Sequence, residues 1–410
     1  MNAVSLAVAS IRSRPLNAML CIVSAVAGIA LLCAVSLFSQ SVTSGFARNA
    51  QGIDIIAGTK GSPLQLVLSS IYHADIPAGN IDMKDYEALK HNPHIRQAIP
   101  LALGDNYKGF RMVGTTSDYL KLYKAKFKDG RAFAAPFETV AGIDTGLKVG
   151  DKFAVSHGFS ADSDDVHDFK LYTVTGVLKP TGTVLDKLLT TQVESVQELH
   201  AAHEEDHHAH EHDESEGEEE AEMALAHQVT SVLLKVRSPV DLMNLPRQIN
   251  SQSNIMATVP SYEMARFMKS LGIGRQLIVV LGTGFVILSA LILLASLASG
   301  LALRRYDLAV LRVLGASPTR LSATIIAEGL ILSCVGSVIG IILGHLVAYT
   351  AVMSISGLRG VVLPETLLML QTIDAGFLML GLGAGLLASF VPSVLASRTD
   401  IAGLLARGLA

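Results

Sequence analysis

Residues 277–303 have the sequence LIVVLGTGFVILSALILLASLASGLAL and are followed at once by Arg304 and Arg305. About 20 consecutive apolar residues suffice for a helix to cross a bilayer. Three further apolar runs reach this length, at residues 16–38, 321–350 and 367–395. The sequence therefore predicts a membrane protein with four transmembrane α-helices in a 1+3 arrangement.

The composition agrees with a protein that is partly membrane and partly water-soluble. Half of the 410 residues are hydrophobic and only 17% are charged, which is too apolar for an ordinary soluble domain. The basic residues are scattered or flank apolar runs, so nothing indicates nucleic-acid binding. The three cysteines, Cys21, Cys33 and Cys334, all lie inside apolar runs, so the polar middle of the chain is expected to fold without disulfides.

The distribution of arginines predicts the orientation, because loops rich in Lys and Arg stay in the cytoplasm. Arginines lie before the first run, between the second and third, and after the fourth: Arg12, Arg14, Arg304, Arg305, Arg312, Arg320, Arg398 and Arg407. A multi-pass protein of the bacterial inner membrane is predicted, with both termini in the cytoplasm. Its parts are an N-terminal segment with the first span (1–40), an extracytoplasmic domain (41–275) and the last three spans (276–410).

The large extracytoplasmic domain is predicted to be α+β. Runs typical of β-strands alternate with helical stretches at 83–92 and 240–252. The predicted strands cover residues 53–58, 110–115, 152–158, 170–178 and 230–236. No nucleophile motif or carboxylate pair stands in a recognisable catalytic context, although His157 and His167 flank an acidic loop that suits either a cation or plain hydration.

Residues 200–222, HAAHEEDHHAHEHDESEGEEEAE, contain six histidines and eleven carboxylates without any Lys or Arg. Imidazoles one helical turn apart suit Zn²⁺, whereas the same composition also suits a solvated polar loop. We expect metal binding to weaken below about pH 6, where imidazole becomes protonated. The predicted zinc ligands are His200, His203, His207, His208, His210 and His212.

Several residues inside the apolar runs indicate helix contacts. Gly336, Gly340 and Gly344 form a GxxxGxxxG row, which lets helix backbones approach closely. The helix on that row belongs either to the same chain or to a second copy at a dimer seam. His345 is isolated in an apolar helix, which favours a packed, hydrogen-bonded side chain over a metal ligand.

Residues 304–328, RRYDLAVLRVLGASPTRLSATIIAE, predict a short basic helix over 304–320 at the cytoplasmic face of the membrane. Its leucines share one side, and Gly315 suits its C-terminal cap. Ser317 suits the N-cap of the next helix, and Pro318 suits its first turn. Glu328 lies near the membrane end of the third run, where an ionisable group usually has a partner.

This segment, with Glu328, resembles the signature of FtsX/MacB-type ABC transporter permeases. Similar stretches are SIRSRPLNAMLCIVSAVAGIALL near the N-terminus, VTGVLKPTGTVLD at 174–186 and PSVLASRTDIAGLLARG near the C-terminus. Many relatives have an RREIG-like sequence where this chain has Arg305, Tyr306, Asp307 and Leu308. The resemblance implies that the 304–320 helix is a coupling helix that contacts an ATPase, through Arg304, Arg305, Leu311, Arg312, Leu314, Gly315 and Glu328.

The resemblance also implies a two-lobed outer domain. The first lobe is expected at about 45–125 and 225–270, with the second lobe inserted at about 126–224. The chain has no G-x-x-x-x-G-K-[ST] phosphate loop, so it is predicted not to be an enzyme and not to bind ATP itself. A separate ABC ATPase is the expected partner, and a two-fold ATPase dimer would need a permease homodimer.

The expected function is that of an ATP-driven permease for export or envelope transport, with a link to zinc through the histidine-rich stretch. The lipid bilayer and a periplasmic or outer-membrane protein are further expected partners. Two alternatives stay open. One is a transmembrane signalling subunit that senses a metal or a partner and carries no cargo. The other is a permease that extracts lipoproteins or lipids.

Overall fold

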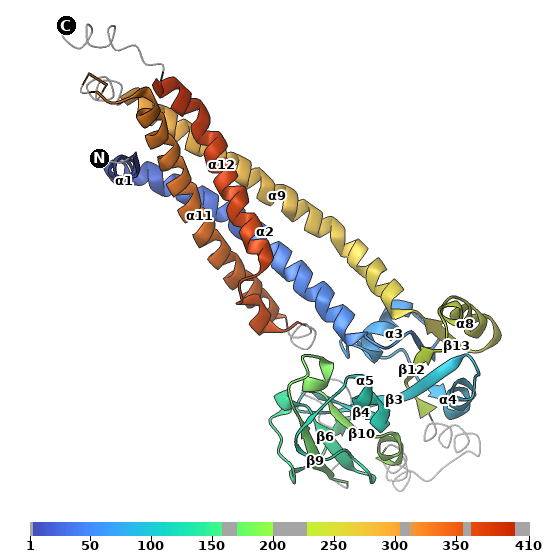
Figure 1. The fold of residues 1–410 in the computed structure, drawn as a ribbon. Coiled ribbons are helices and arrows are strands. Elements are labelled where there is room, and N and C mark those ends of the chain that lie inside the picture. Colours follow the sequence, from blue (N-terminus) through green and yellow to red (C-terminus); the bar gives the residue numbers. More distant parts are fainter. Residues whose placement is uncertain are drawn as a thin grey trace, which may run out of the picture. The chain divides into compact units, whose positions relative to one another are not determined.

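A computed structural model describes residues 3–157, 170–199, 228–303, 312–313, 315–355 and 362–397. The chain divides into two compact units (Figure 1). The helix unit comprises Met1–Ser41, Leu271–Ser356 and Pro364–Ala410, and the inter-span domain comprises Val42–Ser270 and Gly357–Leu363. Helices α2 and α9 each run without a break through a unit boundary.

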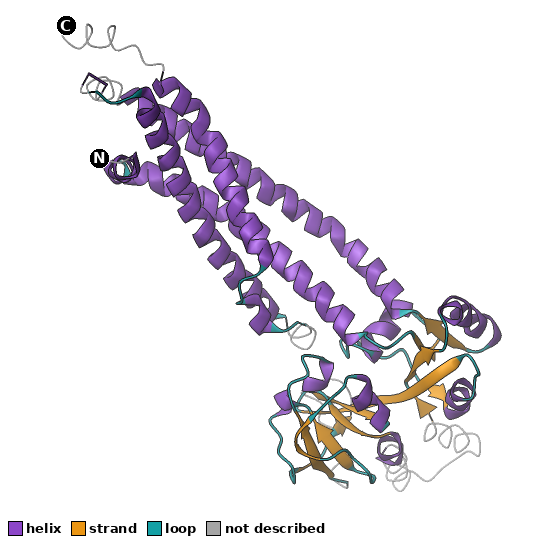
Figure 2. Cartoon of the chain, viewed as in Figure 1, coloured by secondary structure: helices purple, strands orange, loops and turns teal. Residues whose placement is uncertain are grey.

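The helix unit confirms the four predicted spans, which Figure 2 shows as long purple helices. Each is long and apolar enough to cross a membrane. Large apolar side chains such as Leu281, Leu387 and Phe390 are exposed on them, as lipid contact requires. The elements are α1 (Ala3–Ser13), α2 (Pro15–Asn49), α9 (Pro260–Leu303), α11 (Pro318–Ser354), the short η4 (Pro364–Leu367) and α12 (Thr372–Ser397).

The glycine row of α11 packs against α2 of the same chain. A Cβ atom placed on Gly336 would lie 2.6 Å from the Cβ of Ala25, and one on Gly340 would lie 2.9 Å from the Cβ of Ile29. At Gly344 the corresponding neighbour is Cys33, at 2.7 Å. The glycine row was expected to contact a helix either of the same chain or of a second copy. In this structure it contacts α2 of the same chain.

The inter-span domain is built on one 11-stranded sheet. The strand order is β13-β1-β12-β3-β4-β10-β6-β9-β5, with β7 paired to β9 and β8 paired to β3. The strands are β1 (Ile55–Thr59), β3 (Ile95–Tyr107), β4 (Phe110–Thr115), β5 (Phe127–Gly130), β6 (Glu138–Ala141), β7 (Lys152–Phe153), β8 (Ser156–His157), β9 (Tyr172–Leu178), β10 (Leu189–Gln192), β12 (Ser231–Val236) and β13 (Ile255–Thr258).

Short helices and a small ribbon complete this domain. The ribbon pairs β2 (Ile81–Asp82) with β11 (Gln228–Val229). The helices are α3 (Pro63–Ser70), α4 (Met83–Lys90), α5 (Ser117–Leu122), α8 (Pro239–Gln252) and the 3₁₀ turns η1 (Ile143–Thr145) and η2 (Val184–Lys187). Each of the five predicted strand regions contains strand residues, and both predicted helical stretches are helices.

Strands β3 and β4 carry the sheet from the first predicted lobe into the second. On one side Ile99 pairs with Leu233 of β12, and on the other Leu103 pairs with Val113 of β4. Strand β4 precedes the expected start of the inserted lobe at 126, yet it pairs in parallel with β10 inside that lobe. The sheet therefore continues across the expected lobe boundary.

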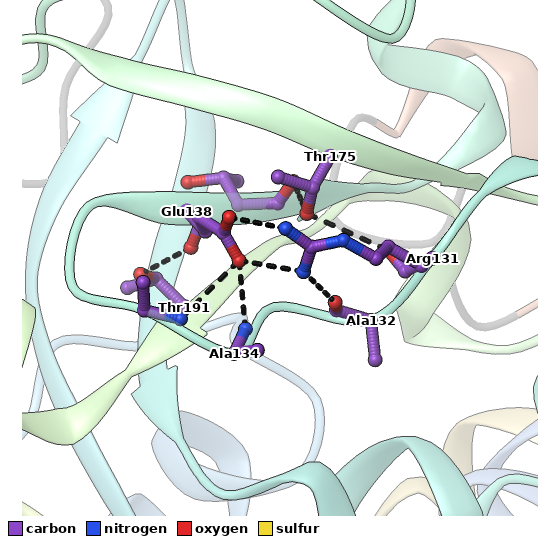
Figure 3. A network of polar contacts seen from close by, with 8 residues as sticks. Arg131, Ala132, Ala134, Glu138, Thr175 and Thr191 are labelled. Carbon is purple, nitrogen blue, oxygen red and sulfur yellow. Dashed lines mark hydrogen bonds and ion pairs between the residues drawn. The ribbon is translucent and has the colours of Figure 1, made fainter.

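A carboxylate fixes the loop between β5 and β6 (Figure 3). The Glu138 carboxylate accepts hydrogen bonds from both guanidinium NH₂ groups of Arg131, at 2.5 and 2.8 Å. It also accepts from the backbone N–H groups of Ala134 and Ala135, at 2.8 and 3.2 Å. These donors, the Arg131 guanidinium foremost, lower the pKa of Glu138 to about 2.

We expect Glu138→Gln to lower the thermal stability of the protein at pH 7 by a few degrees and to have no effect near pH 2. The folded pKa of Glu138 lies below the unfolded value of about 4.3. The stabilisation is therefore present above pH 4.3 and is lost as the pH falls through about 2. Thermal unfolding of the full chain in detergent across this pH range measures it.

Glu87→Gln is the control, because the Glu87–Lys90 pair lies one helical turn apart on the exposed side of α4 and such pairs contribute little. Arg131 is also exposed, so added salt should reduce the effect of Glu138→Gln. An equal loss of stability at pH 7 and pH 2 would contradict the assignment.

Candidate functional site

The end of α2 in the inter-span domain is bound by the loop after β9 and by the first residue of η2. The Arg48 Nε–H donates to the carbonyl oxygen of Gly182 at 2.6 Å. The side-chain oxygen of Asn49 accepts from the backbone N–H of Val184 at 2.8 Å, and Asn49 is fully buried. This loop lies in the predicted family stretch 174–186, and its two hydrogen bonds attach it directly to the last turn of the first span.

Asp186 holds that loop in shape. Its carboxylate accepts hydrogen bonds from the backbone N–H groups of Thr181 and Gly182, at 2.8 and 2.7 Å, and from the hydroxyl of Thr181 at 2.8 Å. Gly182 has φ +67°, a left-handed conformation that favours glycine. A Cβ atom placed on Gly182 would lie 3.2 Å from the side chain of Leu363, which follows the third span in the chain. We call residues 181–186 with Arg48 and Asn49 the α2 clamp.

Aromatic residues hold the same helix end from other sides. The hydroxyl of Tyr72 donates to the carbonyl oxygen of Phe46 at 3.1 Å, and their rings meet edge to face. The hydroxyl of Tyr123 donates to the carbonyl oxygen of Asn49 at 3.0 Å. The bond from Tyr123 satisfies a carbonyl group at the helix terminus, and the bond from Tyr72 adds a second donor to the Phe46 carbonyl, which also accepts the backbone N–H of Ala50. The last turn of α2 is thus fixed at several points within the inter-span domain.

A cavity of about 450 Å³ lies near the other end of α2, inside the helix unit. Residues of α1, α2, α9 and α11 line it together with Arg14, and they include Ser10, Asn17, Thr324 and Glu328. The buried hydroxyl of Ser10 donates to Glu328 Oε2 at 2.8 Å. The predicted partner of Glu328 is therefore found on α1, and the bond ties the N-terminal helix to α11.

We expect Ser10→Ala to release α1 from α11 and to speed tryptic cleavage after Arg12 several-fold. A hydrogen bond to a charged group contributes about 1.5–3 kcal/mol. Limited proteolysis of the full chain in detergent measures this cleavage. Ser13→Ala is the matched control, because the Ser13 hydroxyl donates to the carbonyl oxygen of Ser10 within the same turn of α1. Equal cleavage of both variants would contradict the role of the Ser10–Glu328 bond.

The start of α11 confirms the predicted capping residues. The hydroxyl of Ser317 accepts from the backbone N–H of Arg320, and Pro318 occupies the first turn. Gly315 has φ +95°, and its N–H bonds the carbonyl of Arg312 at 3.0 Å. A sharp turn therefore leads into the third span, as the glycine and proline predicted.

Several predicted site residues lie outside the described part of the chain. Of the expected ATPase contacts, these are Arg304, Arg305, Leu311 and Leu314. All six predicted zinc ligands lie there too: His200, His203, His207, His208, His210 and His212. His157 falls in β8, opposite Asp105 of β3, and His167 lies outside the described residues.

Sequence reasoning missed the partners that complete these sites. Ser10, Asn49 and Asp186 are polar residues without a motif of their own. The resemblance of 174–186 to a family segment was the available signal for the loop. The helix end to which it binds is more than a hundred residues away in the chain and could be found only by folding.

Comparison with known proteins gives two family matches that together cover most of the chain. The MacB-like periplasmic core domain matches residues 18–252, and the FtsX-like permease C-terminal domain matches residues 279–401. A comparison with curated proteins gives no match.

Two solved structures are similar to about half of the chain. The periplasmic region of MacB from Actinobacillus actinomycetemcomitans is 11% identical with a TM-score of 0.33, over 54% of this chain and 97% of that one. The extracellular domain of the noncanonic ABC-type transporter YknZ from Gram-positive bacteria is 14% identical with a TM-score of 0.29, over 50% and 98%.

Proposed function

Because the chain belongs to the FtsX/MacB-like family of ABC transporter permeases, we propose that it is the membrane subunit of an ATP-driven complex. In this proposal a separate ATPase hydrolyses ATP in the cytoplasm, and the permease carries the resulting motion to the inter-span domain outside the membrane. Two copies of the chain would face a two-fold ATPase dimer.

The orientation proposed here rests on the arginines. Arg12, Arg14, Arg312 and Arg320 lie at the end of the helix unit that carries α1 and the start of α11. Loops rich in positive charge stay in the cytoplasm. Both termini would then be cytoplasmic, and the inter-span domain would lie in the periplasm of a bacterium with two membranes.

The observation that carries the proposal is the pair of attachments on α2. This single 35-residue helix packs along the glycine row of α11 in the helix unit. Its last turn is held by the α2 clamp in the inter-span domain. The hydrogen bonds between successive turns of an α-helix make it stiff along its axis, so a helix can transmit a displacement from one end to the other. A shift of α11 caused by the ATPase would therefore reach the loop 181–186 through α2.

The ATPase would act near the cavity of the helix unit. Glu328 on α11 and Ser10 on α1 are joined there, and the 304–320 segment leads into α11. We propose Arg304, Arg305, Leu311, Arg312, Leu314 and Gly315 as ATPase contacts, with Glu328 coupling that contact to the spans.

The histidine-rich stretch supports a zinc-linked version of this function. Six imidazoles and eleven carboxylates within residues 200–222 are a ligand set suited to Zn²⁺. Zinc would bind outside the membrane and adjust export or another envelope task. The same stretch favours the second candidate, a metal sensor that signals through the spans and carries no cargo.

We expect the full chain to bind several equivalents of Zn²⁺, most of which are lost when the six histidines of 200–222 become glutamine. Isothermal titration of the detergent-solubilised protein measures this, and the binding should weaken below about pH 6. Glutamine keeps the polarity and removes the ligand nitrogen. Unchanged binding in the six-glutamine variant would leave the stretch without a metal role.

The test of the permease assignment uses the full chain in the membranes of its own host. After mild solubilisation and affinity purification through a non-histidine tag, an ATPase subunit with a G-x-x-x-x-G-K-[ST] loop should co-purify in equal amount. The complex should hydrolyse ATP, and vanadate should inhibit it. A chain that purifies free of such a subunit and of ATP hydrolysis would contradict the proposal.

A further inference from the structure

Three metal-ligating side chains meet inside the helix unit, each from a different helix. They are Cys33 of α2, His345 of α11 and Asp374 in the first turn of α12. One ligand atom from each lies within 4.8 Å of the other two. All three residues are buried, with exposed fractions of 0%, 7% and 5%.

The hydrogen bonds around His345 leave a contact between two acceptors. Its Nδ1 lies 2.5 Å from the carbonyl oxygen of Leu367. A carbonyl only accepts, so Nδ1 carries the proton, and Nε2 of the neutral ring holds a lone pair. That Nε2 lies 3.1 Å from Oδ1 of Asp374, which is also an acceptor when ionised. A buried contact of this kind needs either a proton on one of the two atoms or a cation between them.

The environment of Asp374 points the same way. Its other oxygen, Oδ2, accepts the backbone N–H of Gln371 at 2.6 Å, so Oδ1 is the atom that faces the cluster. The Sγ of Cys33 lies 3.9 Å from Oδ1 and 3.8 Å from the carbonyl oxygen of Ile341. Both contacts are long, and a single S–H proton serves only one of them.

We propose that Cys33, His345 and Asp374 form a binding site for a divalent transition metal ion, with Zn²⁺ the ion that the ligand set suits best. Thiolate, imidazole and carboxylate are all zinc ligands, and ligand atoms around a tetrahedral zinc lie about 3.3–3.8 Å apart. The separations of 3.1 and 3.9 Å bracket that range. The thiolate disfavours Mg²⁺ and Ca²⁺, which prefer oxygen ligands.

The surroundings complete the site. The carbonyl of Leu367 fixes the ring orientation of His345, and the N–H of Gln371 fixes the carboxylate; such partners usually orient metal ligands. Binding displaces the thiol proton of Cys33 to solvent. A thiolate, a carboxylate and a divalent ion then sum to zero charge, which suits a buried position. Three protein ligands leave a fourth position for water or another ligand.

Because Gly344 has no side chain, α2 packs closely against α11 at this point and places Cys33 in the cluster. A Cβ atom at this position would lie 2.7 Å from the Cβ of Cys33 and 2.9 Å from its Sγ. A metal ion there would connect the first, third and fourth spans next to the segment that joins the last two. This inference goes beyond the proposed permease function and does not rest on it, and it does not involve the histidine-rich stretch.

The experiment replaces zinc with Co²⁺ in the full chain in detergent. Thiolate bound to Co²⁺ gives a charge-transfer absorption in the near ultraviolet, and residues 200–222 contain no cysteine. The band therefore reports cysteine ligation alone. We expect about one thiolate-ligated Co²⁺ per chain, displaced by Zn²⁺. The band should disappear in Cys33→Ser and lose most of its intensity in Asp374→Asn.

Cys334→Ser is the matched control, since Cys334 lies on α11 away from the cluster, and it should keep the band. Elution of each variant as a single species in size-exclusion chromatography shows that it is folded. No band in the folded parent chain, or an equal band in Cys33→Ser, would overturn the site. A shared proton would then hold the His345–Asp374 contact in place of a metal ion.

Discussion

Gly340→Leu is expected to disrupt the helix unit and to cost about 3 kcal/mol or more of stability, at the upper end for overpacked cores. A Cβ at this position would already lie 2.9 Å from the Cβ of Ile29 and 3.1 Å from the carbonyl oxygen of Val26. The second neighbour is backbone, so α2 as a whole would have to move away. Thermal loss of helical circular dichroism, with the full chain in detergent, measures the change.

Gly383→Leu on α12 is the matched control. In the described structure nothing lies within 4 Å of a Cβ placed there, so leucine would point into lipid and should leave the midpoint nearly unchanged. The comparison separates close packing from the general effect of a larger side chain. Equal midpoints for the two variants would contradict the packing of α11 on α2.

Asp186→Ala is expected to uncouple the inter-span domain from the spans while ATP hydrolysis continues. The substitution removes the acceptor for two backbone N–H groups and one hydroxyl. Bonds to a charged group contribute about 1.5–3 kcal/mol each, so the loop should lose its fixed shape. The bonds from Gly182 and Val184 to α2 depend on that shape.

The readout is the ATPase rate of the purified complex together with an ATP-dependent movement of the inter-span domain. We expect the ATPase rate to stay within about twofold of the parent. The ATP-dependent movement should fall about tenfold or more, because losing a single bond of at least about 1.4 kcal/mol corresponds to a tenfold change. Asp129→Ala, which removes an exposed carboxylate of β5, is the control. A normal movement in Asp186→Ala would rule out the α2 clamp as the coupling element.

The sequence predicted best what depends on local pattern. The four spans follow from apolar length, and the turn before α11 follows from Gly315, Ser317 and Pro318, whose roles are set by backbone geometry. Strand β3 was missed because its sequence lacks a regular alternation of apolar and polar residues and contains Pro100. Proline usually argues against a central strand. The pairing of β3 on both sides is a tertiary effect that outweighs local preference.

The candidate sites depend on contacts between distant segments. The role of Asp186 depends on the contacts of its loop with Arg48 and Asn49, and the role of Glu328 depends on its hydrogen bond with Ser10. His345 was expected to be a packed, hydrogen-bonded residue, and its bonds are as expected. The nearby Cys33 and Asp374 come from helices whose relative placement no sequence pattern encodes. The glycine row predicted close helix packing, but the sequence did not indicate which helix packs against it.

In the proposed function, ATP hydrolysis moves the inter-span domain through α2. The most direct test of this movement places spin labels at Met243 of α8 and Leu281 of α9, both exposed positions, in the complex with its ATPase. Distances are measured without nucleotide and after trapping with ATP and vanadate. We expect the distance distribution to shift on trapping and Asp186→Ala to remove the shift. Superimposable distributions in a parent complex that hydrolyses ATP would contradict the proposed movement.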